Sequence, residues 1–242
     1  VRDAFRICKE VGILTIAGYL RARGVDVDVV DGQVQEDATW VPRVAEYDVI
    51  GFSINTANVE TAMHHIETIK ARSARTLIAL GGPHALAAPE VFINHPQIDV
   101  VFVGEWERSF YEFLTTSDPK RVAGLYLKDA QSPSGFHFTG SRAWDTALDE
   151  LPFPALDLVD VTKYRYYPKA MTPISSIMTS RGCPQQCIFC FHNMGRTYRV
   201  RSAQLVVDEI QWQVETLGVR EISVYDDNFS LHRQRAMDVA QG

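Results

Sequence analysis

Short apolar runs alternate with helical segments through the first half of the chain, and this alternation limits the possible folds more than any other feature. The apolar runs are nearly continuous and lie at 48–54, 76–80 and 99–103. Unbroken apolar runs are typical of strands buried on both faces of a parallel sheet. Helical spacing fills the segments between them, at 58–72, after Pro89 and at 105–114. The order predicts an α/β fold, a doubly wound parallel sheet in the Rossmann or flavodoxin style with helices on both faces.

Further elements are expected on either side of this core. Towards the N-terminus, the spacing predicts a helix over Phe5–Arg23 that stops at Gly24, a strand over Val25–Val30 and a short helix over Val41–Tyr47. Two runs after residue 120 predict a β-hairpin, at Val122–Lys128 and Phe136–Thr139. The last quarter predicts one more strand–helix–strand unit and the start of a helix, at Ile174–Met178, Ala203–Leu217, Glu221–Tyr225 and near Gln234.

The turns after three predicted strands are candidates for a ligand site, because ligands of doubly wound sheets lie beyond the carboxyl ends of the strands. All three turns are rich in glycine or small polar residues, which suits a large ligand lying along the sheet edge. The candidate residues are Ser53, Ile54, Asn55 and Thr56 in the first turn, Gly81, Gly82, Pro83 and His84 in the second, and Gly104 and Glu105 in the third.

A proline- and tyrosine-rich stretch with little periodicity separates this region from the rest of the chain. We therefore predict a first α/β domain over residues 1–143, an ordered linker over 144–173 and a second domain over 174–242. The 242 residues are 46% hydrophobic, which is enough to bury a core in each.

Three of the four cysteines are crowded into the segment 180–192, with three residues and then two between them. Cys183, Cys187 and Cys190 can hold either a zinc ion, with His192 as a fourth ligand, or an iron–sulfur cluster. A four-iron cluster held by three thiolates keeps one iron free for another ligand. Structural zinc loops usually supply two separated ligand pairs, and the crowding therefore favours the cluster.

The composition excludes several classes of protein. The net charge is −6 and the basic residues are scattered, which argues against a nucleic-acid partner. No apolar run has the length of a membrane span and no signal peptide opens the sequence. Clustered thiols point to a reducing, cytoplasmic location. Because the chain begins at Val1 and ends inside a predicted helix, we expect it to be a piece of a longer protein.

The cysteine spacing after a strand, introduced by Thr-Ser-Arg-Gly-Cys-Pro at 179–184, resembles the radical S-adenosylmethionine superfamily. The resemblance implies a 4Fe–4S cluster on Cys183, Cys187 and Cys190, whose open iron binds S-adenosylmethionine, with Phe189 near the adenine. An electron from the cluster then generates a 5′-deoxyadenosyl radical. By the same resemblance, polar residues after the next strand hold the methionine amino group, and the candidates are Asp226, Asp227 and Asn228. A helix N-cap is an equally good interpretation of these residues.

The domain before the cysteines sharpens the resemblance to the cobalamin-binding branch of that superfamily. The segments at 51–56, 81–85 and 103–107 each resemble loops that in this branch contact the corrin ring and its nucleotide tail. Trp106 departs from the pattern, since the branch commonly has glycine there. The Asp-x-His-x-x-Gly signature is absent, so no histidine is assigned as a lower axial cobalt ligand. We expect His84 to line the loop or to form a local hydrogen bond instead of binding cobalt.

The resemblance implies a cobalamin-dependent enzyme that cleaves S-adenosylmethionine reductively and methylates an unactivated carbon of a small-molecule substrate. An electron donor such as flavodoxin or ferredoxin is implied as a partner. Oxidative cyclisation or rearrangement, as in the anaerobic porphyrin ring cyclase, remains open, and so does a non-catalytic zinc-binding module. The branch opens with a further strand and closes with a larger barrel, so we expect these 242 residues alone to turn over little substrate.

Overall fold

The computed structural model describes residues 11–164 and 171–242. The first turns of the helix predicted from Phe5, and residues 165–170 of the predicted linker, lie outside the described residues. Contacts divide the chain into two compact units. Glu36–Trp144 form one, called here the sheet unit. The chain up to Gln35 joins Asp145–Gly242 in the other, called here the cysteine-loop unit.

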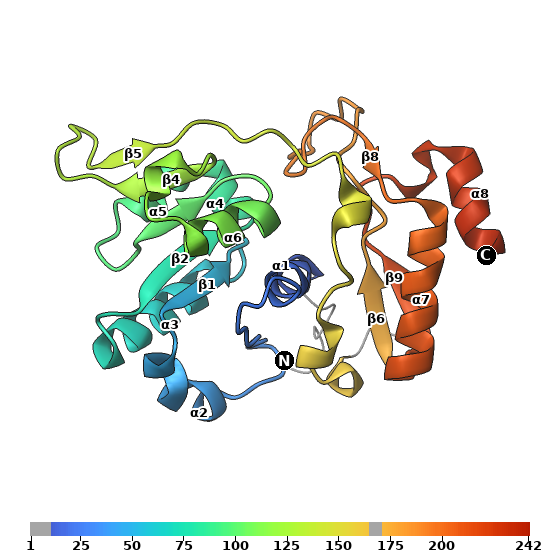
Figure 1. Ribbon diagram of the computed structural model, residues 1–242, viewed down its shortest axis with the longest axis horizontal. Coiled ribbons are helices and arrows are strands. Elements are labelled where there is room, and N and C mark those ends of the chain that lie inside the picture. The colour runs from blue at the N-terminus through green and yellow to red at the C-terminus, as the bar shows by residue number, and fades with distance from the viewer. Residues whose placement is uncertain (1–10, 165–170) are drawn as a thin grey trace. The chain divides into compact units, whose positions relative to one another are not determined.

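The sheet unit alternates strands and helices in the predicted order (Figure 1). Its strands are β1 (Val49–Ser53), β2 (Leu77–Gly81), β3 (Val100–Phe102), β4 (Leu125–Lys128) and β5 (Phe136–Phe138). Its helices are α2 (Asp37–Trp40), α3 (Val59–Arg72), α4 (Pro83–Ala87), α5 (Pro89–Ile93) and α6 (Glu107–Thr115), with 3-10 turns at Val41–Glu46 and Pro119–Arg121. The short helix predicted at Val41 is thus a 3-10 turn, with Pro42 in its first turn.

The strands form one five-stranded sheet in the order β1-β2-β3-β4-β5. β1, β2 and β3 are parallel, as predicted from their continuous apolar runs. β4 and β5 form the predicted hairpin, which extends the same sheet because β4 pairs antiparallel with β3. The sheet is therefore mixed. Its parallel strands, β1 to β3, are the ones that the candidate ligand loops follow.

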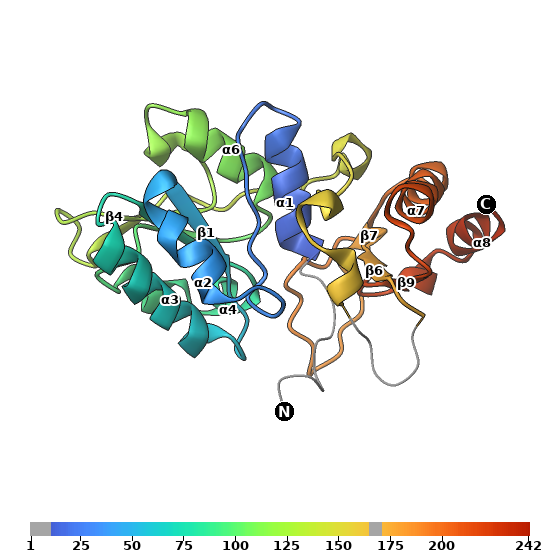
Figure 2. The same cartoon turned by 90° about the horizontal axis from the view of Figure 1, so that it is seen from below.

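Different helices cover the two faces of the parallel strands, α3 on one and α6 on the other (Figure 2). One face carries large aliphatic side chains, including Ile78 and Leu80, which form a buried cluster with Ile66 and Ile69 of α3. The other face carries small residues and is covered by aromatic side chains at the start of α6; Trp106 and Phe110, for example, lie against Gly51. Helices thus cover both faces, as the strand pattern predicted.

The strand predicted over Val25–Val30 is wrong. Residues 25–31 have no regular secondary structure, and none of them belongs to a strand. An extended segment becomes a strand only when a neighbour completes its hydrogen-bond ladder, and this segment is fixed by side chains instead. The Tyr164 hydroxyl donates to Asp31 Oδ2 at 2.7 Å, and the Asp31 amide donates to Gln35 at 2.6 Å. Val30 remains 41% exposed, which a buried strand would not allow.

Within the described residues, the cysteine-loop unit contains a short parallel pair of strands, a two-residue antiparallel ladder and three α-helices. Its elements are α1 (Val11–Arg21), β6 (Ile174–Ile177), β7 (Ser180–Arg181), β8 (Arg199–Val200), α7 (Ala203–Leu217), β9 (Glu221–Val224) and α8 (Arg233–Gln241). β6 and β9 are parallel and are joined through α7, which is the predicted strand–helix–strand unit. α7 has the predicted bounds, because the Ser202 side chain caps its first turn and Gly218 ends it in the left-handed conformation.

The proline-rich stretch contains 3-10 turns at Leu148–Glu150, Leu156–Leu158 and Val161–Lys163. It packs on α1, where the Ala155 amide donates to the Leu14 carbonyl at 2.9 Å. Gly18 lies so close to the Phe153 carbonyl that no side chain would fit. The stretch is therefore ordered, as predicted, over the residues described. The domain boundaries at 143 and 173 stay a prediction, since the contacts group α1 with this stretch and with the cysteine segment.

We find no helix, within 11–164 and 171–242, that is both long and apolar enough to cross a membrane.

Candidate functional site

The cysteine segment is a loop closed at its base by a two-stranded ladder. β7 and β8 pair antiparallel through Ser180 with Val200 and Arg181 with Arg199. Gly182 follows β7 with φ of 79°, and its Cα faces the Thr197 carbonyl so closely that a Cβ atom would overlap it. Only glycine satisfies both conditions. The glycine before the first cysteine is therefore required by the closure of the loop.

The three thiols lie on the open side of this loop. Cys187 and Cys190 are exposed, Cys183 is half-buried, and all three are free cysteines. No three metal-ligating side chains converge anywhere in the described parts of the chain. The donor set nevertheless fits a cluster, because it supplies three thiols on one loop. His192 donates from Nε2 to the Gln185 carbonyl at 2.8 Å, which leaves its Nδ1 as the ring nitrogen that could bind a metal.

Apolar side chains next to the cysteines face solvent. Ile188 and Phe189 are 103% and 89% exposed, and Phe191 is 55% exposed. Phe189, the predicted adenine neighbour, is thus accessible to a ligand. Its role stays a prediction.

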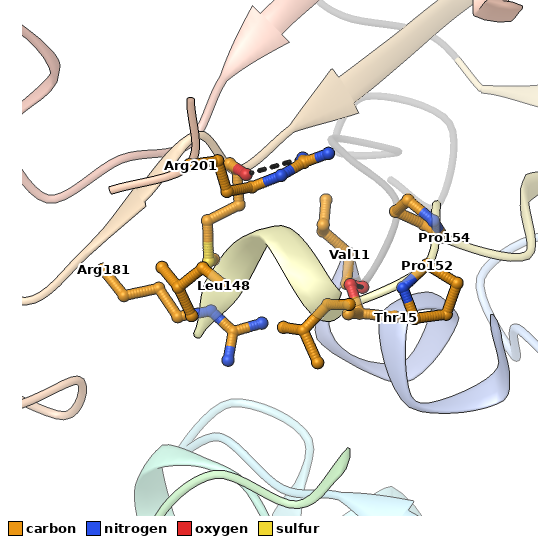
Figure 3. Close-up of a pocket in the computed structure, with 9 residues that line it drawn as sticks. Val11, Thr15, Leu148, Pro152, Pro154, Arg181 and Arg201 are labelled. Carbon is orange, nitrogen blue, oxygen red and sulfur yellow. Dashed lines mark hydrogen bonds between the residues drawn. The ribbon is translucent and has the colours of Figure 1, made fainter. Parts of the chain in front are cut away.

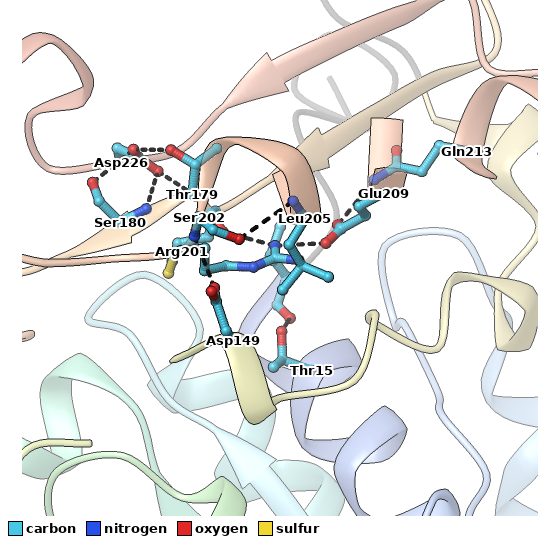
Figure 4. A network of polar contacts seen from close by, with 12 residues as sticks. Thr15, Asp149, Thr179, Ser180, Arg201, Ser202, Leu205, Glu209, Gln213 and Asp226 are labelled. Carbon is cyan, nitrogen blue, oxygen red and sulfur yellow. Dashed lines mark hydrogen bonds and ion pairs between the residues drawn. The ribbon is translucent and has the colours of Figure 1, made fainter. Parts of the chain in front are cut away.

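Asp226 fixes the chain just before the cysteine loop (Figure 4). Its Oδ1 accepts from the amides of Thr179 at 2.6 Å and Ser180 at 3.0 Å. Its Oδ2 accepts from the hydroxyls of the same two residues at 2.5 and 2.7 Å. Four donors on one carboxylate hold the end of β9 against the start of the loop. In these contacts Asp226 anchors the chain before the loop and does not cap a helix.

The next two predicted contacts to S-adenosylmethionine are placed differently. Asp227 Oδ2 accepts from the Gly182 amide at 3.2 Å and so also orients the loop. Asn228 precedes the 3-10 turn Phe229–Leu231 at its N-cap position, but its side chain makes no capping hydrogen bond. The structure thus brings Asp226 and Asp227 to the base of the cysteine loop. Binding of S-adenosylmethionine by any of the three stays a prediction.

Buried charged groups also stabilise the base of the cysteine loop (Figure 4). Arg201 Nη1 pairs with Glu209 Oε2 of α7 at 2.5 Å, and the two side chains are 9% and 0% exposed. Burial raises the pKa of the Glu209 carboxyl above its ordinary value, while the Arg201 charge acts in the opposite direction. Arg235 of α8 donates to the Thr179 and Arg201 carbonyls at 2.6 and 2.8 Å. These contacts join α7 and α8 to the strand that carries the loop.

A small pocket adjoins this network (Figure 3). Arg181 and Arg201 are its charged lining residues, and Met178 lies beside them. The remaining lining is apolar apart from Thr15, and comes from α1 and the proline-rich stretch: Val11, Leu148, Leu151, Pro152 and Pro154.

The predicted ligand loops of the sheet unit meet at the carboxyl ends of β1 and β2. The Ile54 amide donates to the Gly81 carbonyl at 2.7 Å, and the His84 amide donates to the Ile54 carbonyl at 3.0 Å. The Thr56 hydroxyl and His84 Nδ1 are 3.0 Å apart, which is the local hydrogen bond expected for His84. Asn55 and Asn58 close the first loop, because each side-chain oxygen accepts from the other residue's amide. Two of the three loops are therefore locked together without a ligand.

The remaining candidates lie in the same region. Ser53 ends β1, Gly82 connects β2 to α4, and Pro83 is the first residue of α4. Gly104, with φ of 99°, and Glu105 lie between β3 and α6. The third loop reaches the other two through Trp106, whose indole lies directly on Gly81.

Comparison with known proteins shows which proteins this arrangement is similar to. Residues 2–114 match the B12 binding domain family. An uncharacterised methyltransferase of Pyrococcus horikoshii is 27% identical over 238 residues, which are 95% of this chain and 51% of that protein. The anaerobic magnesium-protoporphyrin IX monomethyl ester cyclase of Rubrivivax gelatinosus is 27% identical over 93% of this chain and 42% of that protein. The chain thus spans about half the length of these curated relatives.

A solved structure supports the fold. The cobalamin-dependent S-adenosylmethionine radical enzyme OxsB, with aqua-cobalamin bound, matches 100% of this chain and 35% of its own with a TM-score of 0.79 and 22% identity. The chain is therefore similar, over nearly its whole length, to proteins in which an α/β domain of the B12 binding type precedes a three-cysteine segment. In fold it is similar to a cobalamin-dependent radical S-adenosylmethionine enzyme.

Sequence reasoning missed the residues that hold the cysteine loop in place. Asp226 was considered as a ligand contact or a cap, not as an anchor for Thr179 and Ser180. Glu209 gave one usable signal, since it lies three residues after the apolar Val206 and so shares a face of the helix with it. A charged residue at such a position predicts a buried partner.

Proposed function

We propose that the protein is a cobalamin-dependent radical S-adenosylmethionine enzyme that methylates an unactivated carbon of a small-molecule substrate. The observation that carries the proposal is the loop of three free thiols, Cys183, Cys187 and Cys190, closed at its base by β7 and β8. When bound, the cluster and S-adenosylmethionine supply reductive cleavage, and the corrinoid supplies methyl transfer.

The residues of the chain have separate tasks in this proposal. The three cysteines hold the cluster, and Asp226 and Asp227 fix the loop that carries them. Phe189 and Asn228 face the S-adenosylmethionine. The loops that begin at Ser53, Gly81 and Gly104 hold the corrinoid along the sheet edge. A flavodoxin or ferredoxin supplies electrons in the cytoplasm, and neither nucleic acid nor membrane takes part.

Cyclisation or rearrangement is the alternative within the same enzyme class. The similarity to the Rubrivivax gelatinosus cyclase favours it, because that relative matches nearly as much of the chain as the methyltransferase does. The products distinguish the two. S-adenosylhomocysteine together with 5′-deoxyadenosine supports methyl transfer, whereas 5′-deoxyadenosine alone supports cyclisation or rearrangement. Residues 1–242 alone should turn over little substrate, and robust turnover by them would contradict this.

The metal content tests the proposal directly. After anaerobic reconstitution of the intact protein, we expect iron and sulfide at cluster stoichiometry and broad visible absorption. Cys187→Ala should lose the iron and keep the corrinoid, because the two sites lie on different parts of the chain. Cys8→Ala, outside the motif, is the matched control and should keep both. Colourless protein with one zinc per chain would show that the three cysteines form a zinc module instead.

A further inference from the structure

Trp106 fills the carboxyl edge of the sheet at the point where the three ligand loops meet. It is the residue before α6, and only 8% of its surface is exposed. A Cβ atom placed on Gly81 would overlap the indole ring, and one placed on Gly51 would lie 3.5 Å from it. The indole therefore lies directly on the backbone of β2 at Gly81 and is in ordinary contact range of β1 at Gly51.

The surface beneath the indole is made of small residues. Gly51 pairs with Ala79 and Ser53 pairs with Gly81 in the parallel register, and alternate residues of a strand share a face. Glycine in a strand often marks a place where a ligand or another part of the chain approaches the backbone closely. The opposite face of the same two strands carries Phe52 and Leu80, so the small residues are confined to the face that Trp106 covers.

The indole is packed on both sides but its polar atom is not satisfied. Its ring centroid lies 4.6 Å from that of Phe102 and 5.5 Å from that of Phe110. Trp106 Nε1 is buried and has no hydrogen-bond acceptor within the described residues. Because buried N–H groups normally find acceptors, this position is not explained by the packing of the sheet unit alone. The Trp106 Nε1–H group therefore still needs a hydrogen-bond acceptor.

We infer that Trp106 occupies the space that the planar base of a corrinoid's nucleotide tail would take. The site is therefore selective for corrinoids that lack the nucleotide tail. The inference rests on the proposed corrinoid binding by these loops. A corrinoid consists of a broad macrocycle and a tail that ends in a flat aromatic base of about the size of indole. The base and the indole cannot both lie on Gly51 and Gly81. The macrocycle can still lie over the exposed ends of the loops, near Thr56 and His84.

Equilibrium binding of two corrinoids to the intact protein tests this. Aquacobalamin carries the nucleotide tail and aquacobinamide lacks it, and both are followed by their visible absorption and by quenching of tryptophan fluorescence. We expect the wild-type protein to bind cobinamide at least as tightly as cobalamin. Trp106→Gly should shift the ratio of the two dissociation constants towards cobalamin by about tenfold or more, because it uncovers the small-residue surface.

Two further variants keep the test decisive. Trp106→Leu replaces the glycine variant in the binding test if that variant does not fold, since leucine covers less of the small-residue surface and is not planar. Trp40→Phe is the matched control, because Trp40 packs on the opposite, aliphatic face and also has an unsatisfied Nε1; it should leave the ratio unchanged.

The outcomes separate this inference from the proposed function. Wild-type protein that binds cobalamin about tenfold more tightly than cobinamide, or a ratio that neither Trp106 variant changes, would overturn the inference while corrinoid binding stands. Failure to bind either corrinoid would remove the proposed corrinoid function, and the inference with it.

Discussion

The two candidate sites are supported in opposite ways. At the sheet edge, the loops hold one another: Ile54 and His84 bond to the neighbouring loop, and Trp106 covers their common floor. In the cysteine loop, the base is held from outside by Asp226 and by buried arginines, whereas the thiol side makes few contacts and is exposed. A surface that is already formed binds a large rigid ligand with a smaller loss of conformational entropy. A cluster can order its own loop, because ligand binding and folding are coupled.

The buried ion pair beneath the cysteine loop is the strongest test of this contrast. Glu209→Ala would leave Arg201 buried without its carboxylate, which costs about 3–5 kcal/mol in comparable cases. We expect a loss of that size in urea unfolding of the cysteine-loop unit. Glu215→Ala on the exposed face of the same helix should change stability by less than about 0.5 kcal/mol. Equal losses in the two variants would mean that the buried pair does not support the loop.

The anchor at the start of the loop should come next in size. Asp226→Asn replaces the oxygen that accepts from two hydroxyls with an amide group and removes the charge, so we expect a loss of about 2 kcal/mol. The iron content after reconstitution should fall as well, because Thr179 and Ser180 lead directly into the cysteines.

Asp238→Asn is the matched control for this anchor. The Asp238 side chain is exposed and accepts from the Gln234 side chain one turn away on α8, so both stability and iron content should stay at the wild-type level. An Asp226→Asn protein with normal iron content would show that the loop needs no anchor to bind its metal.

The sheet edge is tested by two glycines that Trp106 approaches at different distances, Gly81 on buried β2 and Gly51 on the edge strand β1. Gly81→Ala would overlap the indole and should cost about 1–3 kcal/mol through overpacking. Gly51→Ala meets the same indole at 3.5 Å, an ordinary contact, and should cost less than about 1 kcal/mol. Thermal unfolding of the two variants measures the difference. Trp106→Leu should rescue Gly81→Ala and not Gly51→Ala, and equal effects of the two glycines would contradict the close packing.

Local patterns predicted the elements of both regions well. α7 follows from its spacing together with Ser202 and Gly218 at its ends, and the three parallel strands follow from their unbroken apolar runs. The turns of the sheet edge were found because parallel strands place their carboxyl ends at one edge. The cysteine loop was found because its ligands are close in sequence.

What could not be predicted depends on contacts between distant residues. The segment 25–30 has the alternation of a strand, but a strand also needs a neighbour, which no local pattern supplies. Asp226 lies 46 and 47 residues from the groups that it holds. The position of Trp106 on Gly81 likewise depends on how closely two loops approach. Such contacts determine the shape of each site, while the sequence pattern determines only its place.

A smaller effect is expected at the contact that replaces the missing strand. Tyr164→Phe removes the hydroxyl that donates to Asp31 and should cost about 1–2 kcal/mol in urea unfolding. Burial, and then the Asp31 carboxylate, raise the pKa of Tyr164 well above its ordinary value. A raised pKa contributes stability that is complete below about pH 10, where an unfolded tyrosine titrates, and that falls as the pH rises further. Wild-type protein should therefore lose stability above pH 10 more steeply than Tyr164→Phe.

The matched control for this contact is Tyr198→Phe, because the Tyr198 hydroxyl is buried without a hydrogen-bond partner in the described residues. Its removal should be neutral or slightly stabilising. If both variants have the same stability and keep the wild-type pH dependence, residues 25–31 are held by backbone packing and not by the Tyr164 hydroxyl. The cysteine-loop unit would then depend less on side-chain anchors than we infer from its comparison with the sheet unit.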